Sequence, residues 1–549
     1  MLGTIDLSSI QDENARQLIV QLLNLIEAQS VDLRDAQAEI QRLRDEINRL
    51  KGEQGKPKIK GSRPKPPRVD HSSEQERRKP KPRQKRAKKA SLKIHREQKL
   101  EVDKANLPPD AEFKGYEDVV VQDVVFCADN VRFRKEKYWA GSTGRTYLAQ
   151  LPRGYEGQFG PGLKALTLTL YFGGGMSEPK IRDLYENIGV QISAGQVSNL
   201  LIKGQEVFHT EKEEVCEAGL RSTPWQHTDQ TSTRVDGQNQ HCNIVCNPLY
   251  TFYITTPKKG RLSVLDALRN GRARRFRLND EALGYLESTP LSKATRNWLS
   301  AQCSDQDWDE KTFVERLDTN WPKLNVQQRQ AILSAAAVAA YHAETDTPLV
   351  RLLVCDDAPQ FNWLTEEIAL CWVHEGRHYK KLMPVFVHHL ELLNDFRKQF
   401  WEYYHQLLTY QEQPTLEERT RLEREFDKLF STCTGFDALD ARIAKTRAKK
   451  ASLLTVLKHP EIPLHNNPAE LDARQRVRKR DVSFGPRTQD GVRAWDTFMS
   501  LAATTRKLGI SFYQYIHDRI SKASQIPSLA SLIEARASEL ALGASWSGT

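Results

Sequence analysis

The chain reads PWQHTDQTSTRVDG at residues 224–237 and HCNIVCNPLYTFYIT at residues 241–255. β-Branched and aromatic residues are frequent on both sides of the Asp-Gly pair, so this pattern predicts a strand, a turn and a second, long strand. Cys242 and Cys246 share one face of the second strand because they are an even number of residues apart. We therefore expect these two cysteines to pack in a core rather than to bind a metal.

A second strand signal ends in two acids. Residues 350–355 form a short apolar run that predicts a buried strand, and Asp356 and Asp357 follow it directly. A carboxylate at the end of a buried strand lies at the edge of the sheet, where ligands commonly bind. Together with Asp229 in the first strand, Asp356 is a candidate site residue of an α/β core.

A third acid stands at a predicted helix start. Residues 465–470 read HNNPAE, in which Asn467 can cap a helix with proline in its first turn and Glu470 at its third position. One interpretation is a reciprocal capping box. The other is a carboxylate that faces outward and completes a set with Asp229 and Asp356 for two divalent cations. Three oxygen donors of this kind suit Mg²⁺.

Two intervals of this core have helical patterns, residues 262–348 between the first two acids and residues 385–460 before the third. The second interval predicts a helical insertion that forms an αα-hairpin over the site, because Phe396, Phe400 and Tyr403 recur at helical spacing. The first contains a cluster of five arginines at 269–277, which either hold phosphates or lie in a solvated basic loop: Arg269, Arg272, Arg274, Arg275 and Arg277.

A smaller polar cluster follows the second acid. Cys371 and His374 lie at i and i+3 on a predicted helix, with His378, His388 and His389 nearby. They could bind zinc, although a second ligand pair at the proper spacing is not evident. The alternative is core packing with a hydrogen-bonded histidine.

Upstream of the core, residues 177–188 and 193–202 predict two short helices around Gly189. This pattern is typical of a helix-turn-helix, whose second helix can enter the major groove of DNA. Gln196 and Asn199 would then read base edges. The alternative is an ordinary αα-hairpin without DNA contact.

The segment before these helices is rich in Val, Phe and Tyr. Turn signals at residues 128–130 and 141–144 predict β-hairpins over residues 116–147. Cys127 is the one cysteine there, so this stretch cannot build a metal site by itself.

The N-terminal region combines an apolar repeat with a basic linker. Residues 56–99 contain 18 Lys and Arg against four acids and many prolines, which indicates an extended cationic segment suited to DNA phosphates or a solubilising spacer. The preceding repeat favours a parallel or antiparallel coiled coil with a second copy over a helix packed on its own protein. Its seam positions are Ile19, Leu22, Ile26, Gln29, Leu33, Ala36, Ile40, Leu43, Ile47 and Leu50.

The composition limits the class of protein. The 549 residues carry a net charge of +10 and eight cysteines without a CxxC pair, which argues against a disulfide or zinc-ribbon framework. The longest nearly apolar stretch, residues 331–341, is too short to span a bilayer, and Asp6 stands where a signal peptide would have basic residues. We expect a soluble, cytoplasmic protein with reduced thiols and several domains.

These residues resemble the DDE transposases of the insertion sequence sixty-six family over most of the chain. The C-terminal motifs are the most specific part of the resemblance. The matching stretches are GQFGP at 157–161, ISAGQVSN at 192–199, DQT at 229–231, CWVH at 371–374 with Arg377, and NNPAE at 466–470, which leads to Arg474, Arg478, Lys479 and residues 500–509.

The resemblance implies an α/β ribonuclease H-like catalytic core with large helical insertions, preceded by a coiled coil and a helix-turn-helix. Asp229, Asp356 and Glu470 match the catalytic acids of the family, which hold Mg²⁺, with Mn²⁺ as a substitute. The implied activity is cleavage of transposon ends and transfer into target DNA, in the bacterial cytoplasm at the nucleoid. The implied partners are DNA, a second copy of the chain and accessory proteins of the same element. Arg474, Arg478 and Lys479 would bind the DNA backbone.

The chain departs from the family at three places: Gln230 replaces Glu, Leu471 replaces Arg, and a Cys-rich zinc module is reduced to Cys127. The alternative function is a transposase-derived DNA-binding protein without catalysis.

The expected domain organisation is a coiled coil at 1–52, a basic linker at 53–99, a β-rich, degenerate zinc-binding module at 100–175, a helix-turn-helix at 176–220, the core at 221–520 and a tail at 521–549.

Overall fold

The computed structural model describes residues 10–51, 94–103, 111, 113–540 and 542–546. Its centre is a mixed five-stranded sheet of order β5-β4-β3-β8-β9. Strands β3, β4 and β5 are antiparallel, whereas β8 and β9 run parallel to β3. The bounds are β3 Trp225–Val235, β4 Gln238–Cys246, β5 Thr251–Thr256, β8 Leu352–Cys355 and β9 Glu367–Leu370.

The expected strands are present, with one correction. Asp236 and Gly237 both have positive φ and form the predicted hairpin turn between β3 and β4. The long second strand is instead two strands, because the chain turns after Cys246, where the Asn247 side chain accepts a hydrogen bond from the Leu249 N–H at 2.8 Å. Cys242 and Cys246 are fully buried, which confirms that they are packing residues.

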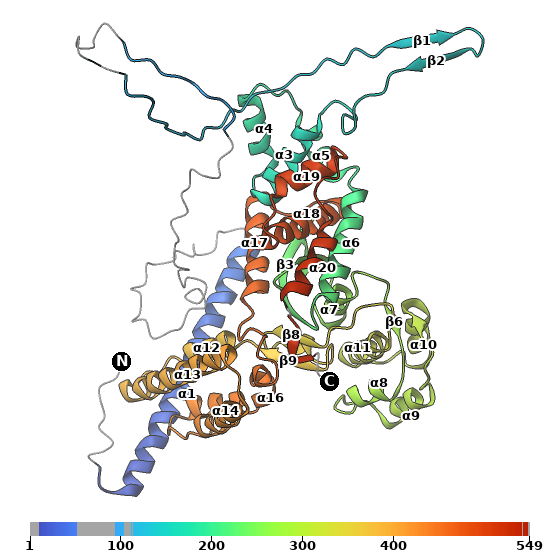
Figure 1. The fold of residues 1–549 in the computed structure, drawn as a ribbon. Helices are drawn as coiled ribbons and strands as arrows, with labels where there is room; N and C mark the ends of the chain where they lie inside the picture. Colours follow the sequence, from blue (N-terminus) through green and yellow to red (C-terminus); the bar gives the residue numbers. More distant parts are fainter. Residues whose placement is uncertain (1–9, 52–93, 104–110, 112, 541, 547–549) are drawn as a thin grey trace.

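Helices from both ends of the core cover the sheet (Figure 1). The helix α17 packs on β3 and β4, α18 packs on β5, and α6 packs on β5, α18 and α20. The bounds are α6 Glu206–Arg221, α17 Asn467–Ser483, α18 Gln489–Lys507, α19 Phe512–Ile520 and α20 Leu529–Leu540.

The expectation of a tail at 521–549 is wrong. Leu529 and Ile533 of α20 are fully buried against the core. The indole N–H of Trp225, on the central strand, donates to the carbonyl of Leu542 at 2.7 Å. The C-terminal segment is therefore part of the core, because its apolar side chains complete the covering of α6.

The first insertion, at 262–348, is mostly helical as expected. Its helices are α7 Arg261–Leu268, α8 Asp280–Tyr285, α9 Lys293–Ala301, α10 Glu310–Asn320 and α11 Val326–His342, with the short strands β6 Arg275–Phe276 and β7 Trp308–Asp309. Each of the five arginines pairs with an acid of the protein, which argues against the phosphate interpretation, while Arg272 and Arg275 are exposed, as the interpretation of a solvated basic loop expects. The pairs are Arg269–Glu344, Arg272–Glu217, Arg274–Asp266, Arg275–Asp307 and Arg277–Asp307.

The second insertion, at 385–460, is also helical and lies on the opposite side of the sheet from the first in Figure 1. It has its own aromatic core, in which Trp372 contacts Phe400, Tyr403 and Phe426. This core also includes Trp225 of the sheet. The bounds are α12 Trp372–Lys381, α13 Val387–Glu412, α14 Leu416–Leu429, α15 Asp437–Arg447 and α16 Lys450–Leu453.

The two helices of the expected helix-turn-helix are present, with Gly189 at φ +81° between them. The region before them is not β-rich, which corrects the expected module at 100–175. A single hairpin forms around the predicted turn at 141–144, no strand occurs in the described residues 113–136, and the apolar run at 163–172 is helical. The bounds are β1 Lys137–Ala140, β2 Arg145–Leu148, α3 Pro161–Leu168, the π-helical turn Thr169–Gly173, α4 Glu178–Asn187 and α5 Ala194–Ile202.

The N-terminal helix α1, Glu13–Leu50, packs on the second insertion along one face. Leu23 and Glu27 are buried there, and the Glu27 carboxylate accepts hydrogen bonds from the Val385 and Phe386 N–H groups. The heptad seam lies on another face, where Leu22, Ile26, Leu33, Ile40, Leu43, Ile47 and Leu50 are exposed. Most of the basic linker lies outside the described residues. No helix in the described part of the chain is long and apolar enough to cross a membrane.

Candidate active site

The first two acids lie beside each other on neighbouring strands. The parallel register of β3 and β8 pairs His227 with Val354. Asp229 and Asp356 each follow that pair by two residues, so their side chains lie at matching positions on the same face of the sheet. The Oδ1 of Asp229 accepts from the Gln230 N–H at 2.7 Å, and the Oδ1 of Asp356 accepts from the Ala358 N–H at 3.1 Å.

The third acid approaches the same place from α17. Burial raises the pKa of Asp229 to about 6, and the negative charges of Asp356 and Glu470 add to this rise. All three predicted acids therefore contribute to one electrostatic environment, although β3, β8 and α17 are far apart in the sequence. Carboxylates whose negative charges raise the pKa of a neighbouring acid form an arrangement that a divalent cation would stabilise, and their hard oxygen donors fit Mg²⁺.

Positive groups surround Glu470. Arg377 contacts both carboxylate oxygens, at 3.3 and 3.2 Å. His374 and Arg474 each contact the carboxylate at 3.5 Å. Burial alone would raise the pKa of Glu470, but the hydrogen bonds from His374 and Arg377 outweigh it and lower the pKa to about 2. Glu470 is therefore ionised, and it must exchange part of these contacts to hold a cation.

The imidazole of His374 is the charged partner of this acid. Its pKa is raised to about 10 by hydrogen bonds to Cys371 and Glu470. Cys371 is buried at the N-cap of α12 and accepts from the Asn466 N–H at 3.3 Å. In the described residues, Cys371, His374 and Glu470 form one of two groups whose possible ligand atoms all lie within 4.8 Å. Glu470 is thus a third possible metal ligand beside Cys371 and His374, which the sequence pattern did not identify.

The capping-box interpretation of Glu470 is wrong, because α17 begins one residue earlier than expected and has no side-chain cap. Its N-cap residue, Asn466, instead reaches β3. The Asn466 side chain donates to the Thr228 carbonyl at 2.8 Å and contacts the His227 ring at 2.9 Å. Asn466 thus fixes the start of α17 against the strand residues that precede Asp229. The repeated asparagine in the sequence was the only signal for this role.

Asp357 is turned away from the other acids. Its carboxylate pairs with Lys449, which also contacts Glu375 at 3.1 Å. His378 lies 3.8 Å from Asp357 and completes the second group of possible metal ligands. The Lys449 ammonium already neutralises this group, and Arg442 pairs with Glu375 as well. We conclude that this cluster is an ion-pair network that ties the second insertion to the residue after Asp356.

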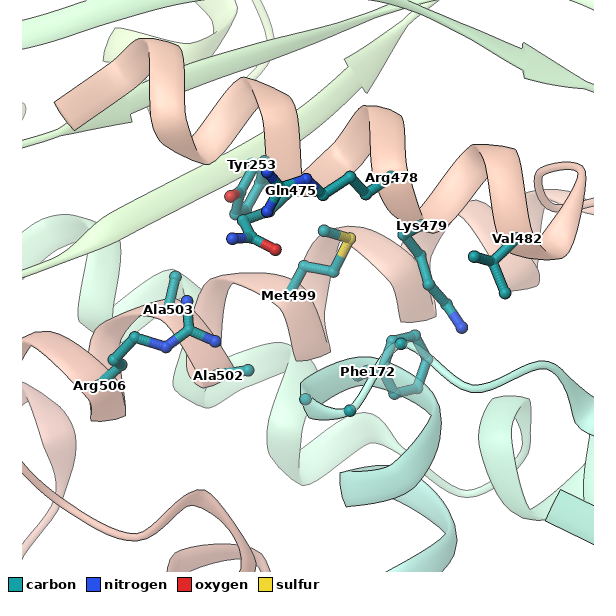
Figure 2. Close-up of a pocket in the computed structure, with 13 residues that line it drawn as sticks. Phe172, Tyr253, Gln475, Arg478, Lys479, Val482, Met499, Ala502, Ala503 and Arg506 are labelled. Carbon is teal, nitrogen blue, oxygen red and sulfur yellow. The ribbon is translucent and has the colours of Figure 1, made fainter. Parts of the chain in front are cut away.

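The three predicted DNA contacts on α17 differ in exposure. Arg474 and Arg478 are exposed on the helix. Lys479, labelled in Figure 2, is only 4% exposed. Its Nζ lies 3.2 Å from the centre of the Tyr171 ring and donates to the Met176 carbonyl at 2.9 Å. The expectation that Lys479 binds the DNA backbone at the helix surface is therefore wrong, because this side chain points into the protein.

The predicted base readers lie on α5, whose N-cap Ser193 accepts from the Gln196 N–H at 3.2 Å. Gln196 is half-buried and Asn199 is exposed. Val197 and Leu201 are buried and hold the helix on the rest of the protein. The face that carries Asn199 is therefore open to a ligand.

Among curated proteins, the chain is similar to the uncharacterized protein y4jO of Sinorhizobium fredii. The two are 32% identical over 323 residues, which are 58% of this chain and 99% of the relative. No protein-family model matches the chain, and no solved structure matches it.

Proposed function

This chain belongs to the same family as y4jO, and we propose that it is a DDE transposase that cuts DNA at transposon ends and joins the freed 3′ ends to target DNA. The observation that carries the proposal is the approach of Asp229, Asp356 and Glu470 from β3, β8 and α17 to one partly buried place. We propose with it that the mixed five-stranded sheet and its covering helices form a ribonuclease H-like core.

The residues of the site have separate roles in this proposal. A cation held by Asp229, Asp356 and Glu470, Mg²⁺ or Mn²⁺, would supply Lewis-acid stabilisation of phosphodiester hydrolysis and strand transfer. His374 and Arg377 keep Glu470 ionised until the cation arrives. Their positive charge then lies beside the acids, where it can attract the anionic DNA backbone.

The proposed partners follow from the surfaces that remain open. DNA ends would be read by Gln196 and Asn199 of α5, and DNA phosphates would contact Arg474 and Arg478 of α17. A second copy of the chain would pair with the exposed seam of α1. We place this activity in the bacterial cytoplasm at the nucleoid, together with accessory proteins of the same element.

A cleavage assay with the full chain tests the proposal. The substrate is a labelled linear duplex that carries the DNA bordering the coding sequence of the protein, incubated with Mg²⁺, Mn²⁺ or EDTA. We expect metal-dependent cleavage by the wild type. Asp229→Asn, Asp356→Asn and Glu470→Gln should each abolish cleavage and leave DNA binding largely intact, because an amide cannot offer the ionised oxygens that Mg²⁺ requires.

Asp357→Asn is the matched control, since it makes the same chemical change next to Asp356 in a residue that pairs with Lys449 instead. We expect it to retain cleavage. Full activity of any one of the three acid variants would remove that residue from the site. Loss of activity in Asp357→Asn together with full activity of Asp356→Asn would exchange their roles.

The second candidate is a DNA-binding protein without catalysis. The observation that favours it is the occupation of both Glu470 oxygens by Arg377. A wild type that binds the duplex but does not cut it with either metal would establish this alternative. The variant Arg377→Gln separates the two cases further, because it should restore metal binding if the ion pair alone prevents it.

A further inference from the structure

A hollow of about 240 Å³ lies two helical turns beyond Glu470, between α17, α18 and the glycine run 173–175 (Figure 2). We call it the α17–α18 hollow. The residues that matter for its chemistry are Gln475, Arg478 and Lys479 of α17, Arg506 of α18, and Phe172 and Tyr253.

Small residues create this space. Residues 173–175 are glycines and the α18 side of the hollow is formed partly by Ala502 and Ala503. A Cβ at Gly174 would lie 3.0 Å from the Leu170 carbonyl, and Gly175 has φ +72°, which L side chains rarely adopt. The chain therefore requires glycine here, and the absence of side chains leaves room for a ligand next to the backbone.

Two of the three cations around the hollow have side chains without partners in the protein. Within the described residues, no hydrogen bond or ion pair joins the side chains of Arg478, Arg506 or Gln475 to another residue, and no acid lines the hollow. Lys479, the third cation, donates to the Met176 carbonyl. By contrast, the five arginines at 269–277 in the first insertion each pair with an acid. Two unpaired guanidinium groups beside one concave space indicate an anion site.

The aromatic residues of the hollow are not available to a base. Phe172 is stacked on Phe498 with ring centres 4.9 Å apart, and Tyr253 is 1% exposed with its hydroxyl bonded to the Asp472 carbonyl. A nucleobase would need an open aromatic face for stacking. The chemistry of the hollow therefore favours a phosphate over a base.

We propose that the α17–α18 hollow binds a backbone phosphate of the DNA strand that enters the site at Glu470, through Arg478 and Arg506. Arg474 and Arg478 follow Glu470 by four and eight residues, so Arg478 lies about 12 Å further along the helix axis, with Arg474 in between. The exposed cations of α17 thus form a track from the acids to the hollow. The proposal rests on the proposed function, because that function places DNA at Glu470.

The test measures DNA binding by the full chain in EDTA, so that it does not depend on cleavage. Affinity for the labelled duplex is titrated over a range of salt concentrations. The double variant Arg478→Gln/Arg506→Gln should weaken binding about equally on end and random duplexes. It should also flatten the slope of log affinity against log salt by about 1, because one phosphate is no longer neutralised.

Two further variants control the charge and the fold. Arg493→Gln removes an exposed arginine from α18 outside the hollow and should leave the slope unchanged. Arg478→Lys/Arg506→Lys keeps both charges and should keep most of the slope. Thermal unfolding should show the same midpoint for all variants, because the replaced side chains are exposed. A slope that is the same in the Gln double variant and in the wild type would overturn the proposal.

Inorganic phosphate distinguishes a free anion from the DNA backbone. If phosphate raises the unfolding midpoint of the wild type but not of the Gln double variant, and DNA binding is equal in both proteins, the hollow takes a free phosphate and the DNA assignment is wrong. Failure of the proposed function has a different result. If the wild type does not cut DNA but the double variant still has a flatter salt slope, the hollow remains a DNA site and the acids have no catalytic role.

Discussion

Lys479 shows how far burial can change the chemistry of a single residue. It lies among Tyr171, Trp495 and the Met176 carbonyl, with Glu178 as the nearest opposing charge. Burial lowers its pKa to about 7, whereas an unfolded lysine has a pKa of about 10.4. The sequence suggested a surface contact because this position follows Arg478, and only the packing of α17 on α18 removes it from the surface.

This pKa shift predicts a pH-dependent stability. Between pH 7 and 10 the unfolded chain binds more protons at Lys479 than the folded chain, so the free energy of unfolding rises with pH in this range, and this group no longer changes it below the folded pKa of about 7. The variant Lys479→Met should lack this contribution. We expect the difference in unfolding free energy between variant and wild type to change by roughly 1 kcal/mol per pH unit.

Chemical unfolding at several pH values between 7 and 10 measures the effect. Lys180→Met, which changes a lysine that is 74% exposed on α4, is the control and should follow the wild type. If the free energies of unfolding of Lys479→Met and the wild type changed with pH in the same way, the Lys479 ammonium would be charged in the folded protein over this range.

At the scale of elements, α1 has one face that packs on the second insertion and another that carries the heptad seam. The face with Leu23 and Glu27 packs on the second insertion, where Glu27 contacts Val385, Phe386 and His389. The large apolar residues of the heptad seam next to it are exposed from Leu22 to Leu50. The sequence predicted both the helix and the seam, but the alternatives of internal packing and self-association were not exclusive.

We expect the seam to pair in parallel with a second copy. In a parallel, in-register pair Gln29 faces Gln29, and Glu39 lies across from Arg44 of the second copy, an acid–base pair of the kind that sets orientation. In an antiparallel pair of full overlap, Gln29 would face Leu33 and lose a polar partner. Deletion of residues 1–50 should therefore lower the mass in light scattering.

Cysteine cross-linking distinguishes the two orientations. The variant Gln29→Cys, made with the exposed Cys127, Cys303 and Cys433 changed to Ser, should form a disulfide-linked dimer under oxidation. A dimer that forms only when Gln29→Cys is mixed with Leu33→Cys would show an antiparallel pair. If the deletion of α1 did not lower the oligomeric state, α1 would make only its contacts within its own chain.

At the scale of the whole molecule, the proposed DNA contacts lie on several parts of the chain. The basic segment at 56–99 supplies charge without base contacts, whereas α5 presents uncharged amides that can pair with adenine edges. Phosphate contacts position a protein on DNA, and base contacts specify the site. Affinity and sequence preference should therefore be separable in this chain.

Two variants test this separation. If the segment at 56–99 engages about six phosphates, its deletion should flatten the salt slope by about 5 and leave end preference intact. Gln196→Ala/Asn199→Ala should reduce the discrimination between end and random duplexes with a smaller change in slope. A linker deletion that abolished end preference, with no effect of the α5 changes, would move recognition to another part, such as the hairpin β1–β2.

Local patterns in the sequence determined the elements and the candidate acids. The apolar run before Asp356 predicted β8, the heptads predicted α1, and helical spacing predicted both insertions, because these signals depend on periodicity along a few turns or one strand. The two short helices around Gly189 followed from turn chemistry in the same way. The pattern alone left Asp229, Asp356 and Glu470 as one of two interpretations, and the family resemblance favoured them as one set.

Only the tertiary structure decided which charges are paired and which are free. Arg269 and Glu344 form a buried pair although 75 residues separate them, and Asn466 contacts His227 across 239 residues. The same packing buries Lys479, leaves Arg478 and Arg506 open at the α17–α18 hollow, and makes the C-terminal residues part of the core. Periodicity shows which face of an element is apolar, but it carries no information about which distant element covers that face, and that choice sets the partner of every charged side chain.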